Sequence, residues 1–243
     1  FLSSTDHFGD GDVRSRVDGR ATTVRFSKLV DATYIEGSIP ATTPAPFEVV
    51  IDARCMPVGG LARMRKPARD FVVIGAGKTG QDACLWLLAN GVSQDQIRWI
   101  RPRDPWIHTR LGTQPGPGLE KTIEIFSGAT EAAALSSSVN ELYQNLEDAG
   151  ALVRIDRSVE PTCYAGKIIS DRELEQLRRI KDVIRIGRVR SIEVDRIILE
   201  EGEVETSPDT LHIQCAAQAL GSPPLKPVFN EDLITLQNLR YGL

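Results

Sequence analysis

The sequence predicts an α/β protein built on a Rossmann-like parallel sheet with flanking β-rich segments, and three observations support this fold class. An apolar run at residues 71–74 leads directly into the glycine pattern G-x-G-x-x-G at 75–80. An amphipathic stretch at 81–90 follows, and a second apolar run comes at 96–100. Strand, helix and strand in this order form a βαβ unit, whose two strands run parallel.

The chain before the glycine pattern carries strand-like segments joined by linkers. Residues 22–34 are rich in β-branched side chains and predict one or two strands. A linker rich in Pro, Thr and Ala occupies 40–46, and residues 47–53 predict another strand. A basic stretch at 63–69 leads into the glycine pattern, so we place a domain boundary after residue 66.

Each glycine of the pattern meets a different steric need. Gly75 permits the tight turn, Gly77 leaves room for a pyrophosphate beside the backbone, and Gly80 lets the helix pack closely on the strand. Free N–H groups at the start of the helix then face the phosphates, while Lys78 either adds positive charge there or is simply solvated. The candidate residues for contact with a dinucleotide are Gly75, Ala76, Gly77, Lys78, Thr79 and Gly80.

The residues after the second apolar run indicate which dinucleotide to expect. An Asp or Glu at this place binds the ribose 2′-hydroxyl of NAD, but this chain has Arg101 and Arg103 on either side of a proline. Two guanidinium groups fit a 2′-phosphate, so the pair predicts NADP over NAD; the alternative is two solvated surface arginines. Asp104 either replaces the missing acid or neutralises Arg103.

Residues 106–118 are rich in Gly and Pro and predict a loop near the cofactor, because ligands lie beyond the carboxyl ends of parallel strands. Trp106, His108 and Arg110 are candidates for cofactor contacts, against the alternative of an ordinary structured surface loop. The remaining expected elements are a helix at 129–149 closed by Gly150, a strand at 151–155, a charged helix at 172–180, paired strands at 183–194 and 196–205 with a turn at 201–202, and a buried strand at 211–219 with a small-residue exit to 222.

Composition excludes several classes of function. The chain has 243 residues, a formal net charge of −4 and 41% hydrophobic residues, which does not favour nucleic-acid binding. No apolar run approaches the roughly 20 residues of a membrane span, and residues 1–4 lack the features of a signal peptide, so we expect a cytoplasmic protein. The four cysteines form no C-x-x-C pair and the three histidines are isolated, so we expect no metal site and assign no catalytic residue.

The stretches 71–84 and 97–106 together resemble the NADP-binding insert of flavin-dependent oxidoreductases with two dinucleotide domains, a group that includes flavin-containing monooxygenases. Weaker similarity to the same group extends to residues 28–34 and 215–217. The resemblance implies that 22–53 and 211–222 belong to an FAD-type domain, with FAD as a second cofactor. That domain's own glycine fingerprint has no counterpart here, nor has the F-x-G-x-x-x-H motif of the monooxygenases.

The resemblance implies three parts, namely a β-rich remnant of an FAD-type domain at 1–66, an NADP-binding Rossmann-like domain at 67–165, and a return to the FAD-type domain at 166–243. We therefore expect a unit that passes hydride from NADPH to FAD, which acts on oxygen or an unknown small organic substrate. A truncated or non-catalytic dinucleotide-binding module is an alternative. A single-cofactor NADP dehydrogenase is another, although no Y-x-x-x-K arrangement supplies its proton donor. The oligomeric state is left open.

Overall fold

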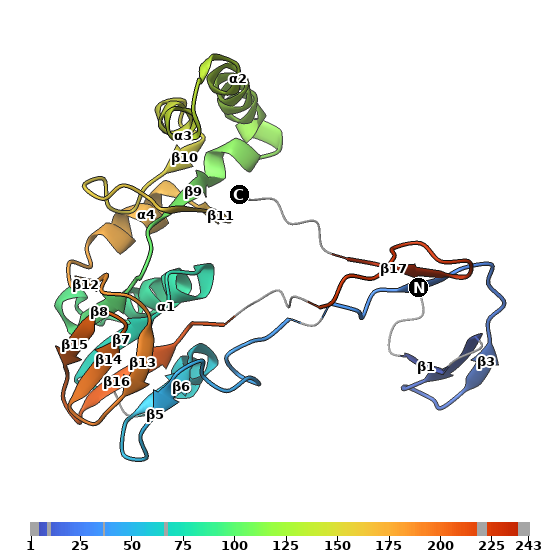
Figure 1. Ribbon diagram of the computed structural model, residues 1–243, viewed down its shortest axis with the longest axis horizontal. Coiled ribbons are helices and arrows are strands. Elements are labelled where there is room, and N and C mark those ends of the chain that lie inside the picture. The colour runs from blue at the N-terminus through green and yellow to red at the C-terminus, as the bar shows by residue number, and fades with distance from the viewer. Residues whose placement is uncertain (1–4, 9–10, 36, 66–67, 218–222, 238–243) are drawn as a thin grey trace. The chain divides into compact units, whose positions relative to one another are not determined.

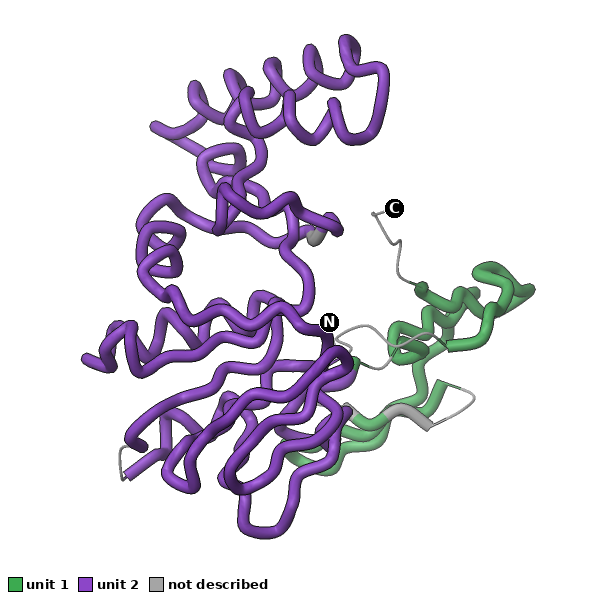
Figure 2. The backbone as a smooth tube through the Cα atoms, turned by 60° about the vertical axis from the view of Figure 1, so that its left-hand side comes forward, with its two compact units in different colours: residues 1–37, 219–240 green, residues 38–218, 241–243 purple. Residues whose placement is uncertain are grey.

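The computed structural model describes residues 5–8, 11–35, 37–65, 68–217 and 223–237. The chain forms two compact units, shown in green and purple in Figure 2. One consists of residues 1–37 with 219–240, and the other of residues 38–218 with 241–243. The predicted domain boundaries after residues 66 and 165 do not coincide with this division and stay predictions. The last two residues of the strand predicted at 211–219 and its small-residue exit to 222 lie outside the described residues.

A five-stranded sheet organises the larger unit (Figure 1), and neighbouring strands in it are parallel throughout. Counted from the strand before the glycine turn, its order matches the 3-2-1-4 arrangement of Rossmann folds, with one more strand at the edge. The protein is thus a mixed α/β structure, consistent with the predicted Rossmann-like sheet. In spatial order the strands are β12 (Val183–Ile184), β8 (Ile97–Ile100), β7 (Asp70–Ile74), β16 (Thr210–Gln214) and β6 (Cys55–Pro57).

Both faces of this sheet are covered, which explains the continuous apolar run in β7. Phe71 and Val73 pack on the face that carries helix α1 (Lys78–Ala89), whose Leu87 is fully buried. Val72 and Ile74 pack on the opposite face in a second apolar cluster. A strand buried on both faces reads as uninterrupted apolar sequence rather than as an alternation.

The second cluster is completed by a four-stranded sheet with the order β15-β14-β13-β5. The predicted turn at 201–202 is confirmed, because it joins two antiparallel strands there and Gly202 has a φ of +156°. The predicted pairing of 183–194 with 196–205 is confirmed for residues 189–192 and 196–199, which are antiparallel. It is wrong for residues 183–184, which form β12 of the parallel sheet. The four strands are β5 (Glu48–Val49), β13 (Val189–Ile192), β14 (Arg196–Leu199) and β15 (Gly202–Glu205).

An insertion between the second and third strands of the parallel sheet carries a small sheet of its own, with the order β10-β9-β11. Its central strand β9 (Pro105–Thr109) corrects the loop predicted at 106–118. Ile107 is fully buried there, so burial in this sheet outweighs the turn-forming residues that follow. The other elements of the insertion are α2 (Leu119–Leu135), α3 (Val139–Asp148), β10 (Leu152–Val153), β11 (Cys163–Ile169) and α4 (Asp171–Arg178).

The single helix predicted at 129–149 is also wrong, because two helices occupy this region. Three consecutive serines separate α2 from α3, and the Ser138 side chain accepts a hydrogen bond from the Glu141 backbone N–H at 3.2 Å. This is an N-cap, which starts a new helix by satisfying one of its free donors. The end of α3 was predicted correctly, since Gly150 has a φ of +72°. The helix predicted at 172–180 is found as α4.

The smaller unit contains two sheets. One is antiparallel and consists of β1 (Thr5–Phe8), β2 (Asp12–Ser15) and β3 (Ala21–Thr23). In the other, β4 (Leu29–Asp31) pairs in parallel with β17 (Leu233–Thr235), which brings together segments about 200 residues apart.

Short 3₁₀ helices of the larger unit lie at Val58–Arg63, Gln94–Gln96, Arg110–Thr113 and Gly116–Gly118. Among the described residues, no helix has the length and apolar character needed to cross a membrane.

Gly80 is held in place by close packing, and its replacement by alanine is expected to destabilise the fold. A Cβ there would lie 2.1 Å from the carbonyl oxygen of Gly75, so helix and turn must separate, at a cost of about 1–3 kcal/mol. Urea unfolding measures the effect. Gly59→Ala is the matched control, because a Cβ at Gly59 meets no described atom within 4 Å. Equal unfolding midpoints for the two variants would contradict the packing role of Gly80.

Candidate functional site

The glycine turn between β7 and α1 is anchored to the neighbouring strands. Gly75 has a φ of +129°, and a Cβ there would lie 3.1 Å from backbone atoms of Cys215, so both conformation and space require glycine. Its N–H donates to the carbonyl oxygen of Ile100 at 3.0 Å, and its carbonyl oxygen accepts from Trp99 Nε1 at 2.9 Å. The predicted roles of Gly75 in the turn and of Gly80 in close packing therefore agree with the structure.

Gly77 differs from the other two glycines, because nothing in the described chain requires a glycine at this place. Its φ of −70° suits any residue, and a Cβ there would meet no described atom within 4 Å. The first main-chain bond of α1 runs from the Gln81 N–H to the Gly77 carbonyl oxygen, so the N–H groups of residues 78–80 have no partner within the helix. The turn thus presents free donors beside open space.

Lys78 lies at the start of this helix and is already engaged by carboxylates. Its ammonium group pairs with Asp82 one turn along the helix and lies 3.6 Å from Glu173 of α4. Arg110 approaches the same Glu173 carboxylate at 3.6 Å. A phosphate near Lys78 would compete with these contacts, and the predicted contribution of Lys78 to phosphate binding stays a prediction.

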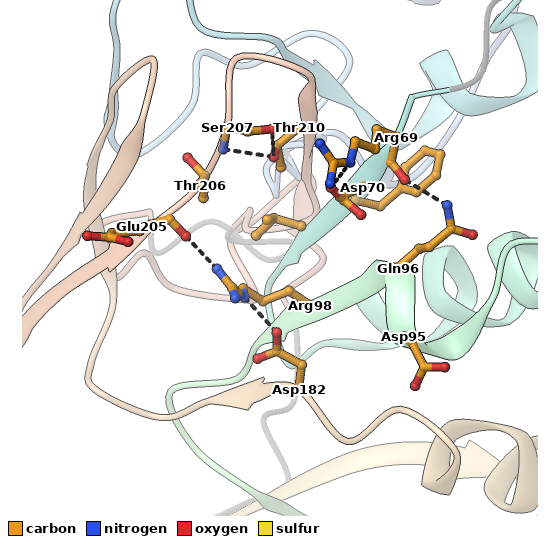
Figure 3. A pocket seen from close by; sticks show the side chains of 12 residues that line it. Arg69, Asp70, Asp95, Gln96, Arg98, Asp182, Glu205, Thr206, Ser207 and Thr210 are labelled. Carbon is orange, nitrogen blue, oxygen red and sulfur yellow. Dashed lines mark hydrogen bonds and ion pairs between the residues drawn. The ribbon is translucent and has the colours of Figure 1, made fainter.

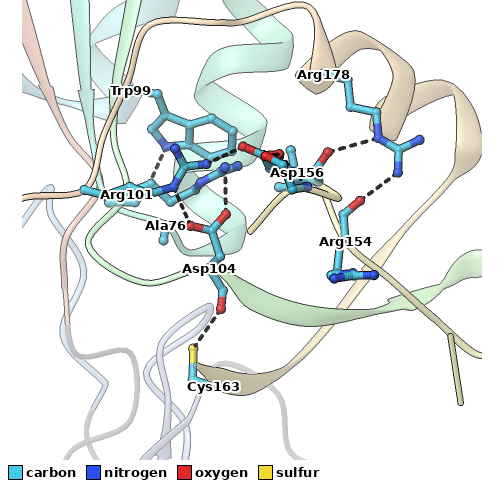
Figure 4. A network of polar contacts seen from close by, with 12 residues as sticks. Ala76, Trp99, Arg101, Asp104, Arg154, Asp156, Cys163 and Arg178 are labelled. Carbon is cyan, nitrogen blue, oxygen red and sulfur yellow. Dashed lines mark hydrogen bonds and ion pairs between the residues drawn. The ribbon is translucent and has the colours of Figure 1, made fainter. Parts of the chain in front are cut away.

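Arg101 is buried rather than displayed at the surface. Its guanidinium group is 1% exposed, lies over the Trp99 ring at 4.8 Å, and pairs with Asp104 at 2.7 Å (Figure 4). Its Nε and Nη1 atoms have no hydrogen-bond partner among the described residues. Burial lowers the pKa of Arg101, while Asp104 acts in the opposite direction. The predicted contact of Arg101 with a 2′-phosphate stays a prediction; what the structure shows is an internal ion pair.

Asp104 takes neither of the two roles considered for it. Instead of neutralising Arg103 or lying free to accept from a ribose, it pairs with Arg101 and with Arg185 at 2.8 Å. Arg185 in turn contacts Asp156 at 2.9 Å, so four charges form one network behind the end of β8. Arg103 is exposed and takes part in no hydrogen bond or ion pair within the described part of the chain.

Lys167 is the residue at this site that the sequence did not indicate. It lies on β11, far along the chain, and its Nζ donates to the carbonyl oxygen of Ala76 at 2.7 Å, within the glycine turn. The pKa of Lys167 is lowered to about 8, chiefly by desolvation. Cys163 acts in the opposite direction, and the positive charges of Arg101 and Arg103 each add a smaller lowering. A cation from the insertion is therefore held beside the turn.

The three candidates on β9 and just after it are placed differently from one another. Trp106 is buried and stacks on Tyr143 with ring centroids 5.7 Å apart, so it belongs to the insertion's core. The His108 Nε2 atom is hydrogen-bonded to the Tyr164 hydroxyl group. Both tyrosines and His108 line an apolar pocket of about 360 Å³. Of the three candidates, only Arg110 remains largely accessible, with 46% of its side chain exposed.

A second pocket, of about 320 Å³, lies at the amino ends of β7, β8 and β16 (Figure 3). Arg98 is one of the residues that line it. Its side chain pairs with Asp182 at 2.8 Å and donates a hydrogen bond to the Glu205 carbonyl oxygen at 2.7 Å. The glycine turn lies at the carboxyl ends of the same strands, where open α/β sheets bind their ligands. We therefore take the glycine turn, and not this pocket, as the candidate functional site.

Burial raises the pKa of three of the four cysteine thiols, which disfavours their reactive thiolate forms. All four are free of disulfides, and burial raises the pKa of Cys215 to about 12 and of Cys55 to about 11. Burial likewise raises the pKa of Cys84. No group of metal-ligating side chains occurs among the described residues. The site is thus a backbone cradle with nearby cations.

The chain is 41% identical over 241 residues to the uncharacterized proteins Rv2000 of Mycobacterium tuberculosis and Mb2023 of Mycobacterium bovis. The match covers 99% of this chain and 45% of each relative, so the chain spans about half the length of these curated relatives. No family model matches the sequence.

Two solved structures show a distant likeness. One is an ornithine N-hydroxylase of Kutzneria sp. 744, named with FADred, NADP⁺ and L-orn, at 14% identity and a TM-score of 0.40, covering 85% of this chain and 49% of the other. The second is an L-lysine 6-monooxygenase of Pseudomonas syringae, at 15% identity and a TM-score of 0.36 with the same coverage.

Proposed function

We propose that the turn between β7 and α1 binds NADP(H), and that the chain is the NADP-binding unit of a longer flavoprotein oxidoreductase of the monooxygenase type. The single observation that carries the proposal is the open space at Gly77. Gly75 and Gly80 are explained by the fold itself, whereas the missing side chain at Gly77 relieves no contact within the described protein. A pyrophosphate that passes close to the backbone supplies the reason for a glycine there.

The surroundings of the turn suit an anion. The free N–H groups of residues 78–80 and the helix dipole both favour phosphate. Lys167 and Arg103 add positive charge on the side where β8 ends. The acid that follows β8, Asp104, is held in internal ion pairs, and Asp82 and Glu173 are paired with Lys78. Without a free carboxylate to accept from a ribose 2′-hydroxyl, the site favours the 2′-phosphorylated nucleotide.

The flavin step concerns the longer protein and rests on the sequence resemblance. In the proposed reaction NADPH supplies a hydride and FAD accepts it. This chain contributes the glycine turn that positions the nucleotide. We expect the substrate-binding residues and the glycine pattern for FAD in the remainder of the longer protein. The two distant structures are enzymes named for such chemistry, but TM-scores of 0.40 and 0.36 do not carry the assignment.

Parallel titrations of the 243-residue chain with NADPH and NADH, followed by nucleotide fluorescence, test the proposal. We expect NADPH to bind about tenfold more tightly or better, because a charge-assisted contact to phosphate contributes about 1.5–3 kcal/mol. The NADPH titration is then repeated with added FAD. A loss of flavin absorbance would show that the 243-residue chain alone supports hydride transfer. Absence of binding by both nucleotides would overturn the proposal and leave a non-functional glycine turn.

A further inference from the structure

Lys167 joins two segments that are far apart in the sequence. It belongs to the insertion, yet its ammonium group is hydrogen-bonded to the backbone of the glycine turn at Ala76. An ammonium group has three donors, and this bond uses one of them. Among the described residues, no carboxylate forms a salt bridge with Lys167. Its charge is therefore uncompensated by an ion pair, at the place where the turn passes the end of β8.

Two arginines that follow β8 act on Lys167 electrostatically. Arg101, which is buried, and Arg103, which is exposed, both disfavour the protonated form of Lys167, while Cys163 on β11 acts in the opposite direction and more strongly than either arginine. The charge of Arg101 is compensated by Asp104. Lys167 and Arg103 form no ion pair within the described part of the chain, so an anion that contacts both compensates two positive charges, which makes a doubly charged phosphate monoester the fitting ligand.

We propose that Lys167, together with Arg103, forms the subsite that selects the 2′-phosphate of NADP(H), and that Arg101 acts behind it as a positioning residue. This inference rests on the proposed binding of a dinucleotide at the glycine turn. The two cations proposed to contact the 2′-phosphate thus come from different segments of the chain, in place of the neighbouring arginines Arg101 and Arg103 that the sequence predicts. Arg101 is held by Asp104 and Trp99, and it fixes the start of the turn between β8 and β9 that carries Arg103.

The first test compares dissociation constants for NADPH and NADH in the full 243-residue chain. Lys167→Met is expected to weaken NADPH binding about tenfold or more, since a charge-assisted hydrogen bond is lost, and to change NADH binding little. Lys167→Arg keeps the charge and should retain most of the preference for NADPH. Lys181→Met is the matched control, because Lys181 is exposed and precedes β12 at the amino ends of the strands.

The second test uses 2′,5′-ADP and 5′-AMP as probes, together with proton uptake on binding. A lysine whose pKa is about 8 is half protonated at pH 8, and a bound dianion favours its charged form. Binding of 2′,5′-ADP at pH 8 should therefore take up to about half a proton per site, and its affinity should fall as the pH rises through 8. The uptake should vanish in Lys167→Met and be small for 5′-AMP.

The outcomes separate this inference from the proposed function. Loss of NADPH preference in Lys167→Met with preserved NADH binding supports both. Equal weakening for both nucleotides, or no change for either, shows that Lys167 only fastens the turn and overturns the subsite while the dinucleotide site stands. Failure of the unmodified chain to bind either nucleotide overturns the proposed function and the subsite with it. Urea unfolding of each variant reports whether the fold is retained.

Discussion

Replacement of Gly77 by tryptophan is expected to abolish NADPH binding while the protein keeps its fold. The indole would fill the space beside the backbone in which the pyrophosphate is proposed to lie, so the dissociation constant should rise above about 1 mM. Stability should change little, because the φ of −70° at Gly77 suits any residue and its Cβ position is open, with no described atom beyond its own stretch of chain within 4 Å. Fluorescence titration and urea unfolding measure the two effects separately.

Gly59→Trp is the control for an added indole, since Gly59 also faces open space in the same unit. It should bind NADPH as the unmodified chain does. A graded series at the site, from Gly77→Ala to Gly77→Val and Gly77→Trp, should lose affinity progressively with side-chain size. Undiminished binding by the tryptophan variant would show that the pyrophosphate does not pass Gly77, and the assignment of the turn would be lost.

Replacement of Asp104 by alanine is expected to cost about 3–5 kcal/mol of folding free energy, the usual result of removing one partner from a buried ion pair. Arg101 would keep its charge at 1% exposure, with no carboxylate to compensate for it. Two of its nitrogen atoms already have no partner among the described residues, which leaves few means of relief. Urea unfolding should show a lower midpoint with an unchanged slope.

Asp156→Ala is the matched control within the same network. Asp156 pairs with the outer arginine, Arg185, and accepts hydrogen bonds from the backbone N–H and hydroxyl group of Ser158. Its side chain is 34% exposed, so the expected loss is smaller, about 1–2 kcal/mol. A double variant, Arg101→Met with Asp104→Leu, should recover much of the stability lost in Asp104→Ala, because apolar side chains need no partner. A loss for Asp104→Ala no larger than that for Asp156→Ala would contradict the buried pair.

The βαβ unit was predictable because its signals are local. The apolar run of β7, the glycines and the amphipathic α1 each depend on neighbours within a few residues, and the steric roles of Gly75 and Gly80 follow from backbone geometry alone. Errors arose where tertiary contacts outweighed composition. Glycine and proline after β9 led to the prediction of a loop where a buried strand lies. The three serines between α2 and α3, of which Ser138 is the N-cap of α3, were taken as helix interior.

The arginines show why a binding site is harder to predict than a strand. Arg101 and Arg103 are two positions apart and look equivalent in the sequence, yet one is buried against Trp99 and the other is exposed. The direction of each side chain depends on what packs around the end of β8. No sequence pattern marked Lys167 as a candidate, since its place beside the glycine turn depends on a hydrogen bond to Ala76, about 90 residues earlier in the chain.

By itself, the sequence determined the parallel βαβ core and the position of its glycine turn, because periodicity and glycine sterics act over one or two turns of chain. Only the tertiary structure decided which charges surround that turn. Parallel pairing brought β12 and β16 to the core sheet from distant segments, and the insertion brought Lys167 to the turn. Packing then separated the cations into those held in internal ion pairs, such as Arg101, and those that form none within the described residues, such as Lys167 and Arg103.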